Sequence, residues 1–218
     1  MKRLCELYRR PIQVCVRLRV MDPQVAEDRT QQFIEHLLKP GQFATFERRP
    51  GSKFRSYLVK SLDNFLRDLA AKDNAQKRGG GVEHVSIDLP TEDGGARPPA
   101  PPTESARVLD REVALDIHAR IISRQQEKYI KAGKQGRLEA LKGFLFGEPP
   151  PNGFGAIAEE LSVTANAVRQ ELWRMRDDYY DSFRAEVAQT VGNTREEVDE
   201  ETRYLLSLLP DEYGTGDR

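Results

Sequence analysis

Apolar residues recur at intervals of three and four along most of this chain, which is the spacing of amphipathic α-helices. Asp22-Pro23 is a typical helix start, because an oxygen side chain caps free amides and proline fits the first turn. We expect the helix that follows to end before Pro40-Gly41, and a longer helix to run from about Phe54 to Lys72. Only 82–89 alternates weakly, so the pattern predicts an all-α fold.

A helix, a tight turn and a second helix are predicted between residues 154 and 176. Thr164 is a suitable N-cap, and Val163 can pack on Val168 across the turn. The second helix then buries one apolar stripe and turns these residues outward: Asn166, Arg169, Gln170, Trp173 and Arg176. Short side chains followed by arginine and glutamine suit a recognition helix in a DNA major groove. A plain helical hairpin is the alternative interpretation.

The predicted helix at 54–72 also has two distinct faces. At 100° per residue, six large apolar residues share one side of it. The opposite side carries Lys53, Tyr57, Lys60, Asn64 and Arg67. Cations beside an aromatic ring and an amide suit the phosphates and unstacked bases of a single strand. An amphipathic helix with a merely solvated face has the same pattern, so this alternative stays open.

The chain divides around a segment rich in proline and glycine. Residues 90–102 contain five prolines and two glycines, and Gly79-Gly80-Gly81 precedes them. Such a composition favours an extended, flexible tether. We therefore expect two small helical domains joined by a flexible acidic linker, followed by an extension. The expected boundaries are 1–78, 79–110 for the linker, 111–191 and 192–218.

Charge is distributed unevenly although the formal net charge is only −1. Residues 47–78 hold nine Lys or Arg against four acids, whereas 83–116 hold eight acids against three arginines. Residues 177–201 hold nine acids against two arginines. A basic block beside acidic segments suits a nucleic acid together with a large protein partner. Solvation of helix surfaces is the simpler explanation of the same runs.

Several classes of protein do not fit the sequence. No apolar run approaches the roughly 18 residues of a spanning helix, and the first residues lack a signal-peptide core, so we expect a cytoplasmic protein without membrane insertion. Cys5 and Cys15 suggest neither a disulfide framework nor a metal site, and no cofactor is expected. A lone helical His118 and a glycine run without Lys-Ser/Thr make an enzyme improbable.

These motifs, in this order, resemble an RNA polymerase sigma factor of the sigma-70 superfamily, extracytoplasmic-function class. Val25-Ala26-Glu27-Asp28-Arg29-Thr30-Gln31-Gln32-Phe33 is similar to the family's polymerase-docking helix, with Arg29 and Gln32 in place of leucine and glutamate. The helix from Phe54 resembles the one that opens and binds the −10 element, and 154–176 resembles the −35-binding domain. The resemblance spans roughly residues 4–191.

The resemblance implies a mechanism and a set of residues. An N-terminally short domain 2 would dock on core RNA polymerase through Glu27, Asp28 and Gln31, and would contact the −10 element through the outward residues of its long helix. Domain 4 would bind the −35 duplex. Its expected DNA-binding residues are Thr164, Asn166, Arg169, Gln170, Trp173, Arg174 and Arg176. The partners are core polymerase and promoter DNA, and an anti-sigma factor is a further candidate.

Two questions remain open at this level. A one-component transcriptional regulator would use the same helix-turn-helix on duplex DNA without binding polymerase. The extension after residue 192 begins like a capped helix at Thr194 and carries Val198, Thr202, Leu205, Leu206 and Leu209 at helical spacing. It either packs back on the second domain or, because its acids resemble phosphates, covers a DNA-binding face.

Overall fold

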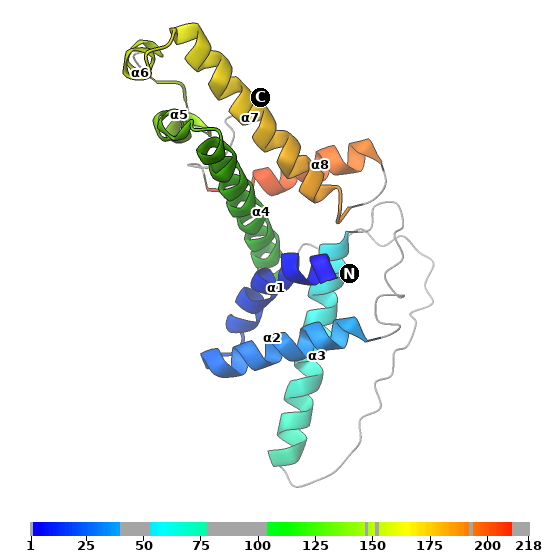
Figure 1. Cartoon of the computed structure of the whole chain (residues 1–218). Helices are drawn as coiled ribbons and strands as arrows, with labels where there is room; N and C mark the ends of the chain where they lie inside the picture. Colours follow the sequence, from blue (N-terminus) through cyan, green and yellow to red (C-terminus); the bar gives the residue numbers. More distant parts are fainter. Residues whose placement is uncertain are drawn as a thin grey trace.

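The computed structural model describes residues 2–39, 53–77, 104–146, 148–150, 153–191 and 194–210. All regular structure within these ranges is helical, which confirms the predicted all-α class (Figure 1). The elements in chain order are α1 (Lys2–Arg17), α2 (Pro23–Leu38), α3 (Phe54–Lys77), α4 (Glu104–Lys131), α5 (Gln135–Leu141), the 3-10 turn η2 (Lys142–Phe144), α6 (Gly155–Glu160), α7 (Ala165–Val187) and α8 (Arg195–Leu206).

Three helix starts follow the capping chemistry expected from the sequence. The Asp22 carboxylate accepts hydrogen bonds from the amides of Gln24 and Val25, with Pro23 in the first turn of α2. The Thr164 hydroxyl accepts from the Ala167 amide, and the Thr194 hydroxyl accepts from the Glu197 amide. Each side chain satisfies backbone donors that have no partner inside the helix.

The main apolar core takes residues from both halves of the chain. It includes Ile12 and Val16 of α1, Phe33 of α2, Leu58 of α3, Ile117 of α4, Phe183 of α7 and Leu205 of α8. Helix α1 packs against both α2 and α4, and α8 packs against α4 and α7. The segments expected to form domain 2 and domain 4 therefore share one core in this structure.

The predicted linker ends earlier than the sequence suggested. Residues 104–110 were expected to belong to a tether, but they form the first part of α4. Leu109, Val113 and Ile117 recur every four residues and are buried in the main core, so burial of this stripe stabilises the helix from its beginning. The proline-rich stretch and the rest of the expected linker, 79–103, lie outside the described residues.

A second, smaller core holds the helix-turn-helix together. It consists of Leu138, Leu141, Leu145, Ala158, Val168, Leu172 and Met175. The long helices α4 and α7 extend from the N-terminal helices toward α5 and α6 (Figure 1). Because α7 contributes to both cores, the position of the helix-turn-helix is fixed relative to α1, α2 and α3.

In the described ranges, no helix combines the length and the apolar character that a bilayer-crossing segment requires. The same ranges contain no group of three or more His, Cys, Asp or Glu side chains placed to hold a metal ion. Cys15 is a buried free thiol, and burial raises its pKa to about 12. This thiol is therefore protonated at neutral pH and packs as an apolar side chain.

Candidate nucleic-acid interface

The turn between α6 and α7 presents the first residues of α7 to solvent. Ser162 adopts a left-handed conformation with φ of 53°, and the Val163 amide donates to the Ala158 carbonyl at 2.9 Å. These features reverse the chain directly before the Thr164 cap. Val163 packs against the small core to which Val168 belongs, as the predicted contact across the turn requires.

The outward face of α7 carries the polar residues that the sequence assigned to it. Asn166, Arg169 and Gln170 are exposed, and Trp173 is 54% exposed. Arg174 is also exposed and donates from Nε to the Gln170 carbonyl at 3.2 Å. The first turn of α7 contains no acid, so its positive helix end and its arginines together favour an anion.

Arg169 is held in a defined orientation. Its guanidinium carbon lies 5.6 Å from the centroid of the Phe154 ring, which precedes α6. Such cation–π contacts lower the number of conformations that the guanidinium samples without removing its hydrogen-bond donors from solvent. Arg169 is therefore oriented and still available to a partner.

The structure corrects the expected outward position of Arg176. Its side chain is half-buried, and Nη2 donates to the Phe144 carbonyl at 2.7 Å. The hydrogen bond ties α7 to the end of η2. At position 176, the side of α7 that carries the arginine faces η2. Arg176 therefore connects α7 to η2 and does not share the outer surface with Asn166, Arg169 and Gln170.

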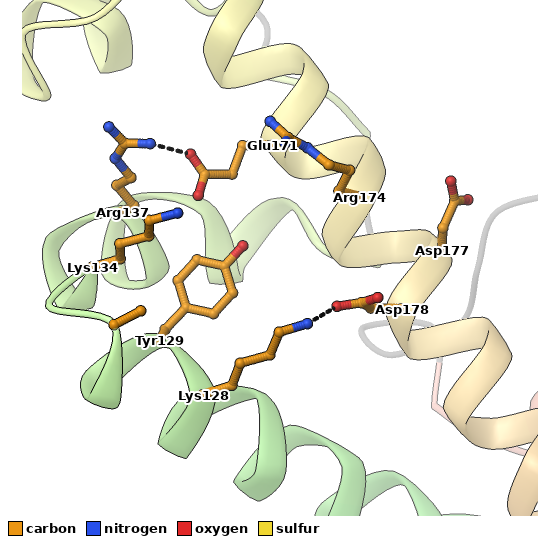
Figure 2. Close-up of a pocket in the computed structure, with 9 residues that line it drawn as sticks. Lys128, Tyr129, Lys134, Arg137, Glu171, Arg174, Asp177 and Asp178 are labelled. Carbon is orange, nitrogen blue, oxygen red and sulfur yellow. Dashed lines mark hydrogen bonds and ion pairs between the residues drawn. The ribbon is translucent and has the colours of Figure 1, made fainter.

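A polar hollow of about 370 Å³ lies beside this face, between the α4–α5 turn and α7 (Figure 2). Arg137 pairs with Glu171 at 2.8 Å, and Lys128 pairs with Asp178. Burial and these two acids raise the pKa of Tyr129 to about 12, so its hydroxyl stays protonated at neutral pH. This cluster was not predicted from the sequence, although the cations near the Gly133 turn were a detectable signal.

The face of α3 differs in part from its prediction. Lys60, Asn64 and Arg67 are exposed, as the helical spacing indicated. Tyr57 is half-buried and stacks on Phe54 with ring centroids 6.2 Å apart, so it belongs partly to the core edge. The predicted single-strand surface is therefore reduced to three exposed residues on α3.

Lys53, the fifth residue of the predicted stripe, pairs with Glu201 of α8. Its Nζ lies 2.8 Å from Glu201 Oε2, while 41% of the Lys53 side chain remains exposed. The neighbouring Arg55 is buried and pairs with both Glu201 and Asp110 of α4. Burial lowers the pKa of Arg55, but the two carboxylates more than offset this and raise it. Sequence reasoning missed Arg55, because its partners lie far along the chain.

The three predicted polymerase-docking residues lie along α2 with different surroundings. Glu27 pairs with Arg9 of α1 at 2.9 Å and accepts a hydrogen bond from Gln13. Asp28 is exposed. Gln31 is exposed and donates to Glu35 at 3.1 Å. Asp28 and Gln31 thus share an accessible surface, whereas Glu27 also holds α1 against α2.

His118 occupies a structural environment. Its Nδ1 lies 2.9 Å from the Tyr179 hydroxyl, and its ring packs on Phe146 with centroids 5.2 Å apart. Burial lowers the pKa of His118 below its ordinary value. The neutral imidazole and the tyrosine together join α4 to α7.

Comparison of the chain with protein-family models, with curated proteins and with solved structures found no match.

Proposed function

We propose that this chain is an RNA polymerase sigma factor of the extracytoplasmic-function type, which binds core polymerase and directs promoter recognition. The observation that carries the proposal is the exposed face of α7, where Asn166, Arg169, Gln170 and Trp173 follow a capped turn. A helix that presents arginine and glutamine near its N-terminus has the side chains that major-groove base edges require.

Binding of duplex DNA would combine contacts to bases with contacts to phosphates, made by α7 and the neighbouring α4–α5 turn. Arg169 and Gln170 are the candidates for base edges, because their side chains project from the second turn of α7. Lys134 and Arg174 at the polar hollow are the candidates for phosphates, since no carboxylate among the described residues pairs with either. Phosphate contacts would fix the register, and the contacts to bases would select the sequence.

A second surface would bind the unpaired strand of an opened promoter. The exposed cations Lys60 and Arg67 flank Asn64 on α3 and suit phosphates and a base edge. The main core connects α3 to α7 through α4, so both surfaces belong to one framework. A chain with two such surfaces gains specificity when both bind one DNA molecule.

Polymerase docking would use the exposed part of α2. Asp28 and Gln31 are accessible, and the resemblance assigns both to the contact with core polymerase. The pairing of Glu27 with Arg9 favours the alternative function, a regulator that binds duplex DNA alone, because it gives this acid an internal role. The two functions differ in whether polymerase is required.

The deciding experiment is co-elution of the full chain with bacterial core RNA polymerase in gel filtration. We expect wild type and Glu200→Arg to co-elute, and Asp28→Arg not to co-elute. Glu200 is an exposed acid on α8, so its reversal controls for the change in net charge. Absence of a complex with the wild-type chain would contradict the sigma-factor proposal, whereas co-elution of all three proteins would contradict the role of Asp28 in docking.

A second measurement separates the alternative. Transcription by the holoenzyme from a random promoter library should enrich a two-part sequence. A stand-alone regulator would instead enrich duplex sites in the absence of polymerase, and it would leave core polymerase without promoter specificity.

A further inference from the structure

One cluster of charged and aromatic side chains joins three helices that lie far apart in the sequence. We call it the Glu201 cluster, and its members are Lys53, Arg55, Asp110, Glu201 and Tyr204. The Glu201 carboxylate pairs with Arg55 through one oxygen and with Lys53 through the other. The cluster connects the start of α3 to α4 and α8.

Glu201, Arg55 and Asp110 of the cluster are buried, Tyr204 is half-buried, and Lys53 forms the partly exposed edge. Side-chain exposure is 1% for Glu201, 5% for Arg55 and 12% for Asp110, against 41% for Lys53. The Tyr204 hydroxyl donates to Asp110 at 2.8 Å, and its ring lies 5.3 Å from the Arg55 guanidinium carbon. Glu201 therefore reaches from α8 to the start of α3, where it pairs with the buried Arg55 and the partly exposed Lys53.

The apolar side of α8 does not require this charge. Val198, Leu205 and Leu206 are buried and would seat the helix on α4 and α7 without Glu201. Removing two charges from water opposes folding, and buried ion pairs are frequently matched or exceeded by apolar replacements. What such a pair adds is a defined orientation, which here fixes α8 against the start of α3.

Lys53 belongs to the same surface as the exposed cations of α3. The Lys53 carbonyl accepts hydrogen bonds from the amides of Ser56 and Tyr57, so Lys53 caps the helix. Lys60 and Arg67 follow at intervals of seven residues, which places all three near one side of α3. The Glu201 carboxylate thus pairs with Lys53 at the end of the predicted stripe whose exposed residues, Lys60, Asn64 and Arg67, the proposed function assigns to single-stranded DNA.

We propose that α8 is a built-in competitor of nucleic acid: its Glu201 carboxylate takes the place of a backbone phosphate on Lys53, and binding of a single strand to α3 displaces this contact. The inference rests on the proposed function and deepens it, since it assigns a regulatory role to the C-terminal helix at the same DNA-binding surface. A phosphate and Glu201 cannot pair fully with the Lys53 ammonium at once, so each weakens the binding of the other.

The test compares Glu201→Gln with Glu200→Gln in the full chain. Both substitutions remove one negative charge from α8, but only Glu201 touches the cations of the cluster. The probe is a fluorescent single DNA strand of about 20 nucleotides, longer than typical site sizes of about 4–16. Fluorescence anisotropy is measured over a range of salt concentrations, with core RNA polymerase present and absent.

We expect Glu201→Gln to bind the strand about three- to fivefold more tightly than Glu200→Gln, the effect of one partly exposed ion pair. Its affinity should also fall more steeply with salt, by about 0.7 in the logarithmic slope, because one more phosphate is neutralised. Tyr204→Phe removes the hydrogen bond to Asp110 at the other side of the cluster and should shift the affinity in the same direction.

Hydrogen exchange provides a readout that a purely structural role would not change. Adding the strand to the wild-type chain should slow exchange at the start of α3 and speed it in α8. Equal affinities for the wild type and all three variants, with unchanged exchange in α8, would overturn the inference while leaving the proposed function intact. Absence of DNA binding by every protein, even with core polymerase, would overturn both.

Discussion

The helix-turn-helix and the junction of α3, α4 and α8 use the same residue type in opposite ways. Arg169 and Arg174 on α7 are exposed. Their described contacts, to Phe154 and Gln170 respectively, lie within the helix-turn-helix segment 154–176. Arg55 on α3 is 4% exposed and pairs with carboxylates from two other helices. An arginine on an amphipathic helix can therefore bind a partner or hold the fold together.

Pairing within the protein therefore determines which charged side chains a partner can contact. The basic block of the sequence counts Lys53, Arg55, Lys60 and Arg67 alike, but two of them already pair with Glu201. By contrast, the described contacts of Arg169 and Arg174 on α7 are to the Phe154 ring and the Gln170 carbonyl and not to carboxylates.

The largest effect is expected at the junction. Glu201→Ala leaves the buried Arg55 with only part of its compensating charge, so the free energy of unfolding should fall by about 3–5 kcal/mol. Glu200→Ala on the exposed side of α8 should change it by less than about 0.5 kcal/mol. Urea unfolding followed by circular dichroism measures both. If the two variants were equally stable, the junction would not differ energetically from an ordinary surface.

The next effect separates two arginines of α7. Arg169→Ala should weaken binding to a duplex site selected from a random library by about 1–3 kcal/mol, because a candidate base contact is lost. Arg176→Ala should instead leave the affinity nearly unchanged and reduce stability by about 1 kcal/mol through its lost hydrogen bond to Phe144. Anisotropy and urea unfolding test the pair, and the reverse assignment of effects would contradict the described geometry.

Helix caps allow the two regions to be weakened separately. Thr164→Ala and Thr194→Ala each remove a hydroxyl that accepts from the first turn, and each should reduce stability by about 1 kcal/mol. Hydrogen exchange should increase in α7 near the turn for the first variant and in α8 for the second. Thr→Ser at either position retains the acceptor and serves as the control. Identical exchange changes in the two alanine variants would show that the regions do not open independently.

The smallest effect is a pH dependence of the contact between α4 and α7. Burial lowers the pKa of His118 from its ordinary 6.5, so the unfolded chain binds a proton more readily than the folded one. The stability due to neutral His118 is fully present above pH 6.5 and is lost as the pH falls through the folded pKa. His118→Gln should flatten the urea-derived stability over this range, and an unchanged slope would contradict the assignment.

Much of the helix-turn-helix was predictable because its contacts are close in sequence. The Thr164 cap, the turn and the buried stripe of Val168, Leu172 and Met175 follow from spacing within a few helical turns. Arg176 was misplaced because a helical wheel gives directions around one axis but does not show that η2 lies against that side. The prediction was wrong at Arg176 because the surroundings of this side chain are determined by a neighbouring element, η2.

Helix α1 shows a second limit of local reasoning. Pro11 lies inside it, although proline removes a helical hydrogen bond and disfavours the preceding turn. Tyr8, Ile12 and Val16 are nonetheless buried against neighbouring helices, so tertiary packing stabilises a helix that local preferences oppose. Residues 104–110, which the sequence predicted to be part of the tether, are likewise helical, since α4 packs against α1.

The helical class, three capped helix starts and the outward positions of Asn166, Arg169, Gln170 and Trp173 on α7 could be predicted from the sequence alone, because these depend on periodicity and on side chains that reach their own backbone. Only the tertiary structure decided that both halves share one core, that Arg55 meets Asp110 and Glu201, and that Lys53 already has a carboxylate partner. Such pairs join residues separated by 55 or more positions in the sequence, and no local pattern specifies which distant charges burial will bring together.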